Sequence, residues 1–188
     1  MNTQFLQHAK KHLFLGCFLL MTLSTQAQSD VNLKGYVVTN ALDTIHGEVF
    51  DLQLGTTSGF IRVEHNYENT VLKFKDFVAY KRGSEIFVKR EHASFKTKAG
   101  SFMQVMITGD VVLYRLDYKA TDDSDDDRIQ HDYYVEKFGG ELAKVDRANF
   151  QNAILPFISD KPEIKEKVEA QEWVYDDLAL IVKEYNKA

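Results

Sequence analysis

The histidines after residue 27 are the side chains best suited to acid–base or metal chemistry. They are His46, His65, His92 and His131, and no two have the i, i+4 spacing that pairs zinc ligands on a helix face. His131 beside Asp132 is interpreted as an exposed pair on a strand. No nucleophile-elbow, Walker, dinucleotide-binding or zincin motif occurs. We therefore predict no catalytic, cofactor-binding or metal-ligating residues and no cofactor, although a site assembled from separate strands stays open.

The segment from Asp122 to Asp127 holds five carboxylates in six residues. Calcium prefers such oxygen ligands, but an EF-hand loop also needs a central glycine and a glutamate at position twelve. The glycine is absent and the twelfth residue is Tyr133, so we interpret the segment as a solvated loop of like charge. The aromatic residues of the later strands are interpreted as packing residues, with a sugar-binding platform as the alternative: Phe102, Tyr114, Tyr118, Tyr133 and Tyr134.

Basic residues gather in the middle of a chain that is acidic overall, with a formal net charge of −5. We interpret them as the solvated side of several strands and as protection of sheet edges. The alternative is contact with an anionic envelope surface or an acidic partner. The residues are Lys73, Lys75, Lys81, Arg82, Lys89, Arg90, Lys96 and Lys98.

Residues 1–27 have the form of a secretory signal peptide. Lys10 and Lys11 precede an apolar run from Leu13 to Leu23, and a small-residue cleavage site ends at Ala27. The run is shorter than the roughly 20 apolar residues of a membrane-spanning helix. An uncleaved anchor, or a lipid on Cys17, is the alternative. We predict export to the periplasm, the outer membrane or the medium, with no transmembrane span in the mature chain.

Cleavage would leave residues 28–188 as a single domain, with a β-rich part at 32–145 and a helical part at 146–188. The only cysteine would be lost, which excludes a disulfide and a thiol nucleophile from the mature chain. The formal charge would move from −5 to −7, because the removed segment contains two lysines and no acid. Such a charge does not suggest a nucleic-acid partner.

Strand signals follow one another through the first part, with turns between them and no helical period. Hairpins are predicted at 35–50, 101–118 and 129–145, strands at 60–64 and 85–90, and one long strand from Thr70 to Tyr80. Gly83 should supply a positive φ in the turn before 85–90. This order favours an antiparallel sheet, a sandwich or a partly closed barrel.

Amphipathic helices end the chain. Phe150, Ile154 and Ile158 lie at helical spacing after Asp146, the predicted N-cap, and Pro156 should kink or end that helix. A capping box at 160–163 predicts a second helix, and a third carries a further apolar stripe. We therefore predict an α+β fold in which two or three C-terminal helices pack on the sheet. The apolar stripe of the third predicted helix consists of Leu178, Ile181, Val182 and Tyr185.

The opening hairpin carries a resemblance. Gly35-Tyr-Val-Val-Thr39 followed by Asp43-Thr-Ile-His-Gly47 resembles the start of a family of exported, uncharacterised proteins of Bacteroidota, in which glycine usually stands where Leu42 is here. The segments 102–114, 133–135, 140–142 and 182–186 are similar as well. The resemblance implies an exported β-rich domain with a helical C-terminus, and it implies no site residues.

Taken together, these features predict an exported cell-envelope or secreted protein that acts as a non-enzymatic binding or interaction module. Its partner would be a protein or a glycan of the envelope. A hydrolase with a site assembled from separate strands is the alternative, and a lipid-carrying barrel is a third. The oligomeric state does not follow from the sequence.

Overall fold

The chain forms an α+β fold with one antiparallel sheet and C-terminal helices, as predicted. The computed structural model describes residues 33–51, 60–91, 101–119 and 129–187. The strands are β1 (Lys34–Thr39), β2 (Thr44–Asp51), β3 (Phe60–His65), β4 (Glu68–Lys73), β5 (Phe77–Arg82), β6 (Glu85–Arg90), β7 (Ser101–Ile107), β8 (Val111–Lys119), β9 (Ile129–Lys137) and β10 (Ala143–Val145). The helices are α2 (Phe150–Ile158), α3 (Pro162–Glu169) and α4 (Leu178–Asn186), with 3-10 turns η1 (Phe74–Asp76) and η2 (Tyr175–Asp177).

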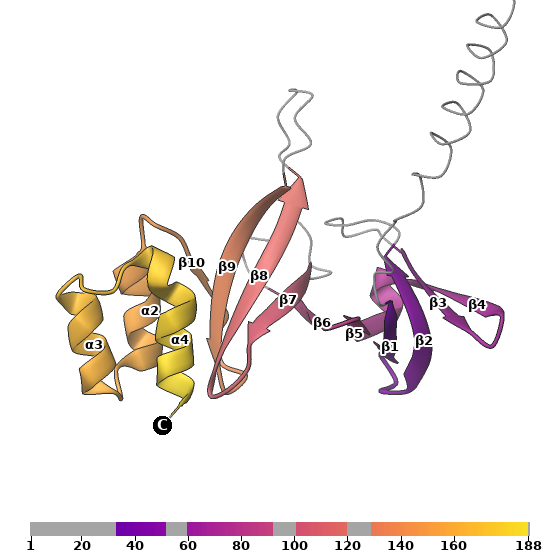
Figure 1. Ribbon diagram of the computed structural model, residues 1–188, viewed down its shortest axis with the longest axis horizontal. Coiled ribbons are helices and arrows are strands. Elements are labelled where there is room, and N and C mark those ends of the chain that lie inside the picture. The colour runs from indigo at the N-terminus through magenta and orange to yellow at the C-terminus, as the bar shows by residue number, and fades with distance from the viewer. Residues whose placement is uncertain (1–32, 52–59, 92–100, 120–128, 188) are drawn as a thin grey trace, which may run out of the picture. The chain divides into compact units, whose positions relative to one another are not determined.

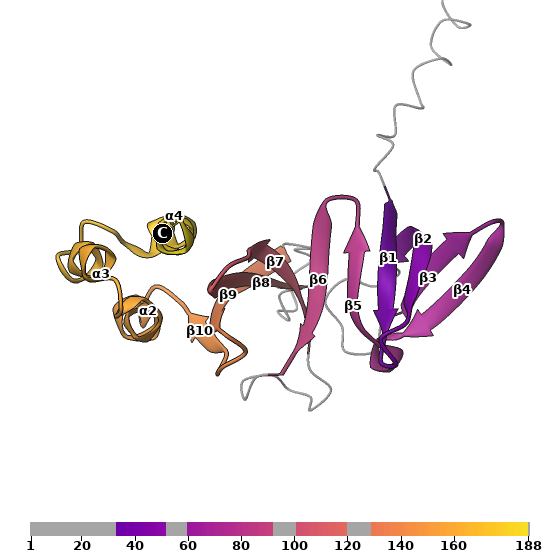
Figure 2. The same ribbon diagram turned by 90° about the horizontal axis from the view of Figure 1, so that it is seen from below.

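The strands form one open sheet in the order β10-β9-β8-β7-β6-β5-β1-β2-β3-β4 (Figure 2). Neighbours in the sheet are neighbours in the chain, except where η1 returns the chain from the edge strand β4 to β5, which pairs with β1. Asn40 fixes this return. Its backbone N–H donates to the carbonyl of Asp76 (3.1 Å), and its side-chain amide donates to the carbonyl of Lys75 (2.7 Å).

The three predicted hairpins are confirmed as β1–β2, β7–β8 and β9–β10. Gly83 has the expected positive φ, 59°. The prediction of a single strand from Thr70 to Tyr80 is wrong, because η1 divides it into β4 and β5. Phe74 occupies this break and packs on Phe102, with ring centroids 5.1 Å apart. At Phe74 the chain therefore leaves the strand conformation, in which successive side chains point to opposite faces of the sheet.

The helices begin later than two predicted caps suggested. Asp146 is not the N-cap of α2: its carboxylate accepts bonds from the backbone N–H groups of Ala148 and Asn149 in the preceding turn, and the N-cap is Asn149. Pro156 lies inside α2, which continues past it to Ile158, so the helix does not end at the proline. Lys161, with no side-chain cap bond, precedes Pro162 in α3, so the predicted capping box is absent.

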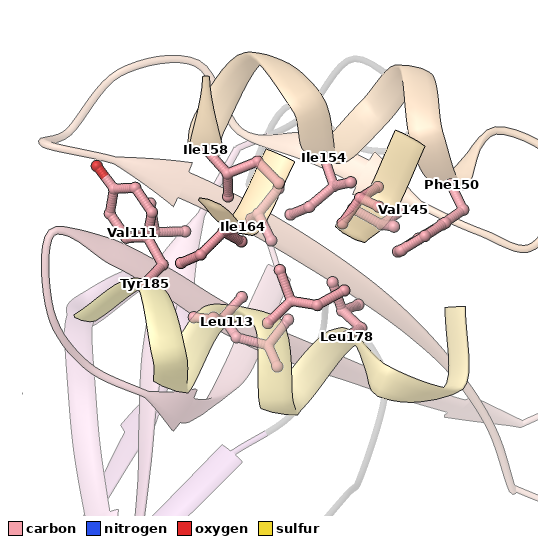
Figure 3. Close-up of a cluster of buried hydrophobic side chains, with 13 residues drawn as sticks. Val111, Leu113, Val145, Phe150, Ile154, Ile158, Ile164, Leu178 and Tyr185 are labelled. Atoms are coloured by element: carbon pink, nitrogen blue, oxygen red, sulfur yellow. The ribbon is translucent and has the colours of Figure 1, made fainter. Parts of the chain in front are cut away.

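The predicted apolar stripes of the helices meet strands β8, β9 and β10 in one hydrophobic cluster. Figure 3 shows residues from α2 and α4 facing Val111 and Leu113 of β8. Each such side chain contributes about 1.5–3 kcal/mol through burial. The helices thus cover one face of this part of the sheet (Figure 1). The cluster's buried members are Val111, Leu113, Val135, Val145, Phe150, Ile154, Ile158, Ile164, Val168, Leu178, Ile181, Val182 and Tyr185.

The helices cover one face of β8 and β9, and every second side chain of these strands points to the opposite, uncovered face. Leu113 pairs with Val135 beneath the helices, and the next pair, Tyr114 with Tyr134, points the opposite way. Tyr114 and Tyr134 pack there with Met103 and with Leu142, which comes from the β9–β10 connection. We call this surface the helix-free face. A third cluster, centred on Tyr80 and Phe87, lies on β1, β2, β3, β5 and β6.

Several predictions fall outside the described residues and stay predictions: the signal peptide at 1–27, the acidic segment at 122–127, and Lys96 and Lys98. None of the helices in the described ranges combines the length and the apolar character needed to cross a bilayer.

Candidate binding pocket

The histidines do not come together in the described part of the chain. His46 on β2 packs edge-on against Tyr36, with ring centroids 5.9 Å apart. His65 ends β3, and by alternation with His46 it faces the other side of the sheet. His131 is exposed on β9, and His92 lies outside the described residues. Their positions offer no acid–base pair and no shared ligand set.

The predicted basic surface is divided between the two faces of the sheet. Lys89 donates to the carbonyl of Phe74 (3.3 Å), and Arg82 pairs with Glu85. Arg90, one residue further along β6, points to the opposite face. Lys73 and Lys75 are exposed, as the interpretation as a solvated side predicts, whereas the basic residues of β5 and β6 are half-buried. Lys89, Arg82 and Arg90 bind groups of the protein itself.

Arg90 is the centre of a charged cluster on the helix-free face. Its Nε donates to Oε2 of Glu136 at 2.8 Å, and its Nη2 donates to the hydroxyl oxygen of Tyr114 at 3.0 Å. The Tyr114 hydroxyl donates in turn to the same Oε2 at 3.0 Å. These side chains come from β6, β8 and β9, and Arg90 therefore spans β7 to reach its partners.

Burial and hydrogen bonding set the charge states of Tyr114 and Arg90 in this cluster. Burial raises the pKa of Tyr114 above its ordinary value, so the phenol is neutral at physiological pH. Burial alone would lower the pKa of Arg90, but the hydrogen bond to Glu136 and the nearby Tyr114 raise it, so the guanidinium stays charged. Glu136 is 7% exposed and is the one charged residue among the buried residues that the structure describes.

The cluster opens into a pocket of about 530 Å³. Glu136 and Arg90 form one wall, and the β9–β10 connection forms another, including Gly139, Gly140 and Leu142. The remaining lining residues, Glu91 and Glu141, are exposed carboxylates. The volume lies in the range of small-molecule sites, but the lining is more polar than usual. The pocket therefore suits a small polar ligand.

The second carboxylate oxygen of Glu136 is turned toward this pocket. Oε2 accepts both hydrogen bonds of the cluster, and Oε1 accepts none from the described residues. Oε1 is also the nearest atom to the open side of Gly139, where an added Cβ would lie 3.9 Å away. Gly139 lines the pocket, so a ligand there would meet Oε1.

A second cluster ties the helices to the sheet. The ammonium group of Lys137 on β9 lies 3.0 Å from both carboxylate oxygens of Asp160, and the hydroxyl of Tyr185 donates to Asp160 at 2.8 Å. Hydrogen bonds from Lys137 and Tyr185 hold the pKa of Asp160 below its ordinary value. The predicted capping residue thus binds a strand and α4 instead, and we assign this cluster to stability.

A further depression of about 370 Å³ lies where α2 begins. Arg147 lines it, but its guanidinium stacks over the ring of Tyr175 at 4.9 Å and pairs with Asp176. Both partners belong to the chain itself, and the site offers no buried polar group without a partner. The pocket at Glu136 is the stronger candidate.

Sequence reasoning missed Arg90, Tyr114 and Glu136 as a group. Arg90 was counted with the basic run and Tyr114 with the aromatic residues, and Glu136 was not singled out. One signal was present: Glu136 follows three apolar or aromatic residues, Tyr133-Tyr-Val135, at the end of a strand. A charge on a buried strand face needs a charged or hydrogen-bonding partner, but only the strand order identifies Arg90 as that partner.

The fold and the pocket define the chain as an α+β protein, whose described residues form an open ten-stranded antiparallel sheet with a charged cluster on its helix-free face. No family model, curated protein or solved structure matches it.

Proposed function

We propose that this protein is an exported module of the cell envelope or the extracellular medium that binds a ligand without turning it over. The observation that carries the proposal is the buried Glu136 carboxylate, which presents one oxygen to an open pocket on the helix-free face. Arg90, Tyr114 and Glu136 come from three strands, and elements of this kind position a binding site more accurately than loops do.

The charge states favour binding over catalysis. A general acid or base works best with a pKa near the working pH. Burial moves the pKa of Tyr114 upward, away from neutrality, and the pKa of Arg90 is also raised. Oε2 of Glu136 accepts hydrogen bonds from both of these side chains. A converging carboxylate pair or a histidine–carboxylate pair would favour a hydrolase, whereas Glu136 bonds Arg90 and Tyr114.

Export is the part of the proposal that rests on residues 1–27. We expect the full chain, expressed in a Gram-negative host with its N-terminus intact, to be recovered outside the cytoplasm and to begin at Gln28. Fractionation followed by intact-mass measurement tests this. A mass that retains residues 1–27, or one that carries a lipid on Cys17, would contradict cleavage after Ala27.

Binding is tested with purified mature protein and isolated envelope material. Amide chemical shifts are followed by NMR as peptidoglycan fragments, lipopolysaccharide or soluble periplasmic proteins are added. We expect shifts around Glu136 and Gly139, which E136Q reduces. E166Q, a matched change at an exposed residue of α3, should behave like wild type. Shifts that spare the pocket, or shifts unchanged in E136Q, would refute this site.

A further inference from the structure

We infer that the pocket beside Glu136 recognises a primary ammonium group of its ligand. The inference rests on the proposed function, because it names the ligand class of that same site. It starts from the carboxylate, which is nine-tenths buried, with its side chain 9% exposed. Its Oε1 lies beside Gly139, which lines the pocket, and an ammonium group there would offer three donors and no acceptor.

The charge balance of the pocket points to a cation. Arg90 supplies one positive charge against the carboxylates of Glu91, Glu136 and Glu141. Arg90 also cannot turn toward a ligand without breaking bonds, since its Nε, Nη1 and Nη2 donate to Glu136, to the carbonyl of Lys89 and to Tyr114. The excess negative charge therefore faces the open pocket, where it attracts a positively charged group.

The spacing of the carboxylates favours an organic cation over a metal ion. No three histidine, cysteine, aspartate or glutamate side chains in the described ranges lie close enough to hold a metal. Calcium needs six to eight converging oxygens. Glu136 can instead accept one hydrogen bond from an ammonium group, while Glu91 and Glu141 at the rim contribute charge without direct ligation. A pocket of about 530 Å³ leaves room for the polar body that carries the amine.

The test uses 1,5-diaminopentane as the probe and 1,5-pentanediol as its neutral counterpart. Mature protein is titrated by NMR at fixed pH and 0.15 M salt, which screens unspecific attraction between exposed charges. We expect the diamine to shift the amides of Gly139, Gly140 and Glu141 with a dissociation constant on the order of 1 mM, as ligand efficiency allows for so small a probe. The diol and calcium chloride should not shift them.

Variants separate recognition from folding. E136Q should weaken diamine binding at least tenfold, and E141Q, at an exposed position, should weaken it about threefold without loss of fold. E166Q removes the same charge from α3 and should change binding less than twofold. Equal binding of diamine and diol, binding of calcium at the same amides, or unchanged diamine binding in both E136Q and E141Q would overturn the inference.

The outcomes also distinguish the ligand class from the proposed function. If the diamine fails but E136Q still reduces the response to envelope material, the ammonium inference is wrong and the binding site stands. If both responses are absent from a folded protein, the binding function fails as well.

Discussion

We predict that the side chain of Asn186, the last residue of α4, contributes about 2 kcal/mol to the free energy of unfolding. It does so through hydrogen bonds to the turn between β7 and β8. Its Oδ1 accepts the backbone N–H of Val111 at 3.1 Å, and its Nδ2 donates to the carbonyls of Val111 (2.7 Å) and Thr108 (3.4 Å). Val111 is fully buried. These bonds join the C-terminal helix to the β7–β8 turn, so N186A should loosen both.

The size of the predicted loss for N186A follows from the backbone groups of Val111 and Thr108 that would lose a hydrogen-bond partner. Removal of a hydrogen-bond partner from a buried backbone N–H costs about 1–3 kcal/mol, and each ordinary hydrogen bond contributes about 1 kcal/mol. Thr108 is exposed, so water can replace the longest of the three bonds. The N–H and carbonyl of Val111 carry most of the loss, which gives the estimate of about 2 kcal/mol for N186A.

Gly109 provides a double-mutant cycle with Asn186. Its φ is 151°, and a Cβ built on it would lie 2.3 Å from Cγ of Asn186. G109A should therefore cost about 1–3 kcal/mol from strain and displacement of the amide. In the N186A background the displacement is absent, so the double variant should be more stable than the sum of the single changes by 0.5 kcal/mol or more, as expected of groups in contact.

Urea denaturation, followed by circular dichroism and by fluorescence of Trp173, the chain's one tryptophan, measures these free energies. Agreement of the two probes would license a two-state treatment. A loss below about 0.5 kcal/mol for N186A, within the usual range of surface changes, would refute the assignment. So would additivity of N186A and G109A.

Two further predictions concern the packing of the helices. I154A should lower the free energy of unfolding by about 2–5 kcal/mol in urea titration, because Ile154 is fully buried between α2 and the sheet; the exposed change E166Q is the control, and an equal effect of both would contradict the core assignment. D160N should destabilise the protein at neutral pH. Because the pKa of Asp160 is lowered from its ordinary 3.8, the stabilisation is complete above that value and is lost as pH falls through the lower folded-state pKa. Denaturation curves of wild type and D160N should therefore converge in acid, and a difference that persists below pH 2 would contradict the ion pair.

Local signals predicted most of the elements because each was decided by neighbouring residues. The alternation from Val111 to Tyr118 marked β8, and the spacing of Leu178, Ile181 and Tyr185 marked the buried face of α4. The break at η1 was not predictable in this way, since Phe74 continues the apolar alternation of β4 in sequence. Its place in the 3-10 turn η1, where its ring packs on Phe102, is seen only in the three-dimensional structure.

The candidate site was out of reach of sequence reasoning for a different reason. Arg90 and Glu136 are 46 residues apart, and their contact depends on β6, β7, β8 and β9 lying in chain order with a particular register. A one-residue slip would turn each side chain to the other face. Hairpin signals predict neighbouring strands but not the register between β6 and β7, and the link between those strands lies outside the described residues.

Leu42 lies in the turn of the opening hairpin with a left-handed backbone, and this conformation has a measurable consequence. Its φ is 67° and it is 75% exposed. The turn is closed by the backbone N–H of Thr39, which donates to the carbonyl of Asp43, and by the N–H of Asp43, which donates to the Thr39 hydroxyl. A left-handed backbone costs a residue with a Cβ about 1–2 kcal/mol, whereas glycine costs about 0.5–1 kcal/mol in chain entropy. L42G should therefore stabilise the protein by about 0.5 kcal/mol.

L42A is the matched control, because it removes the same apolar side chain but keeps the Cβ and its strain. We expect it to be no more stable than wild type, so the gain should belong to glycine alone. Urea denaturation of the three proteins measures the order. If L42G and L42A lose stability equally, by about 1 kcal/mol or more, the Leu42 side chain contributes through packing. That result would contradict the prediction that backbone strain at Leu42 limits the stability of the turn.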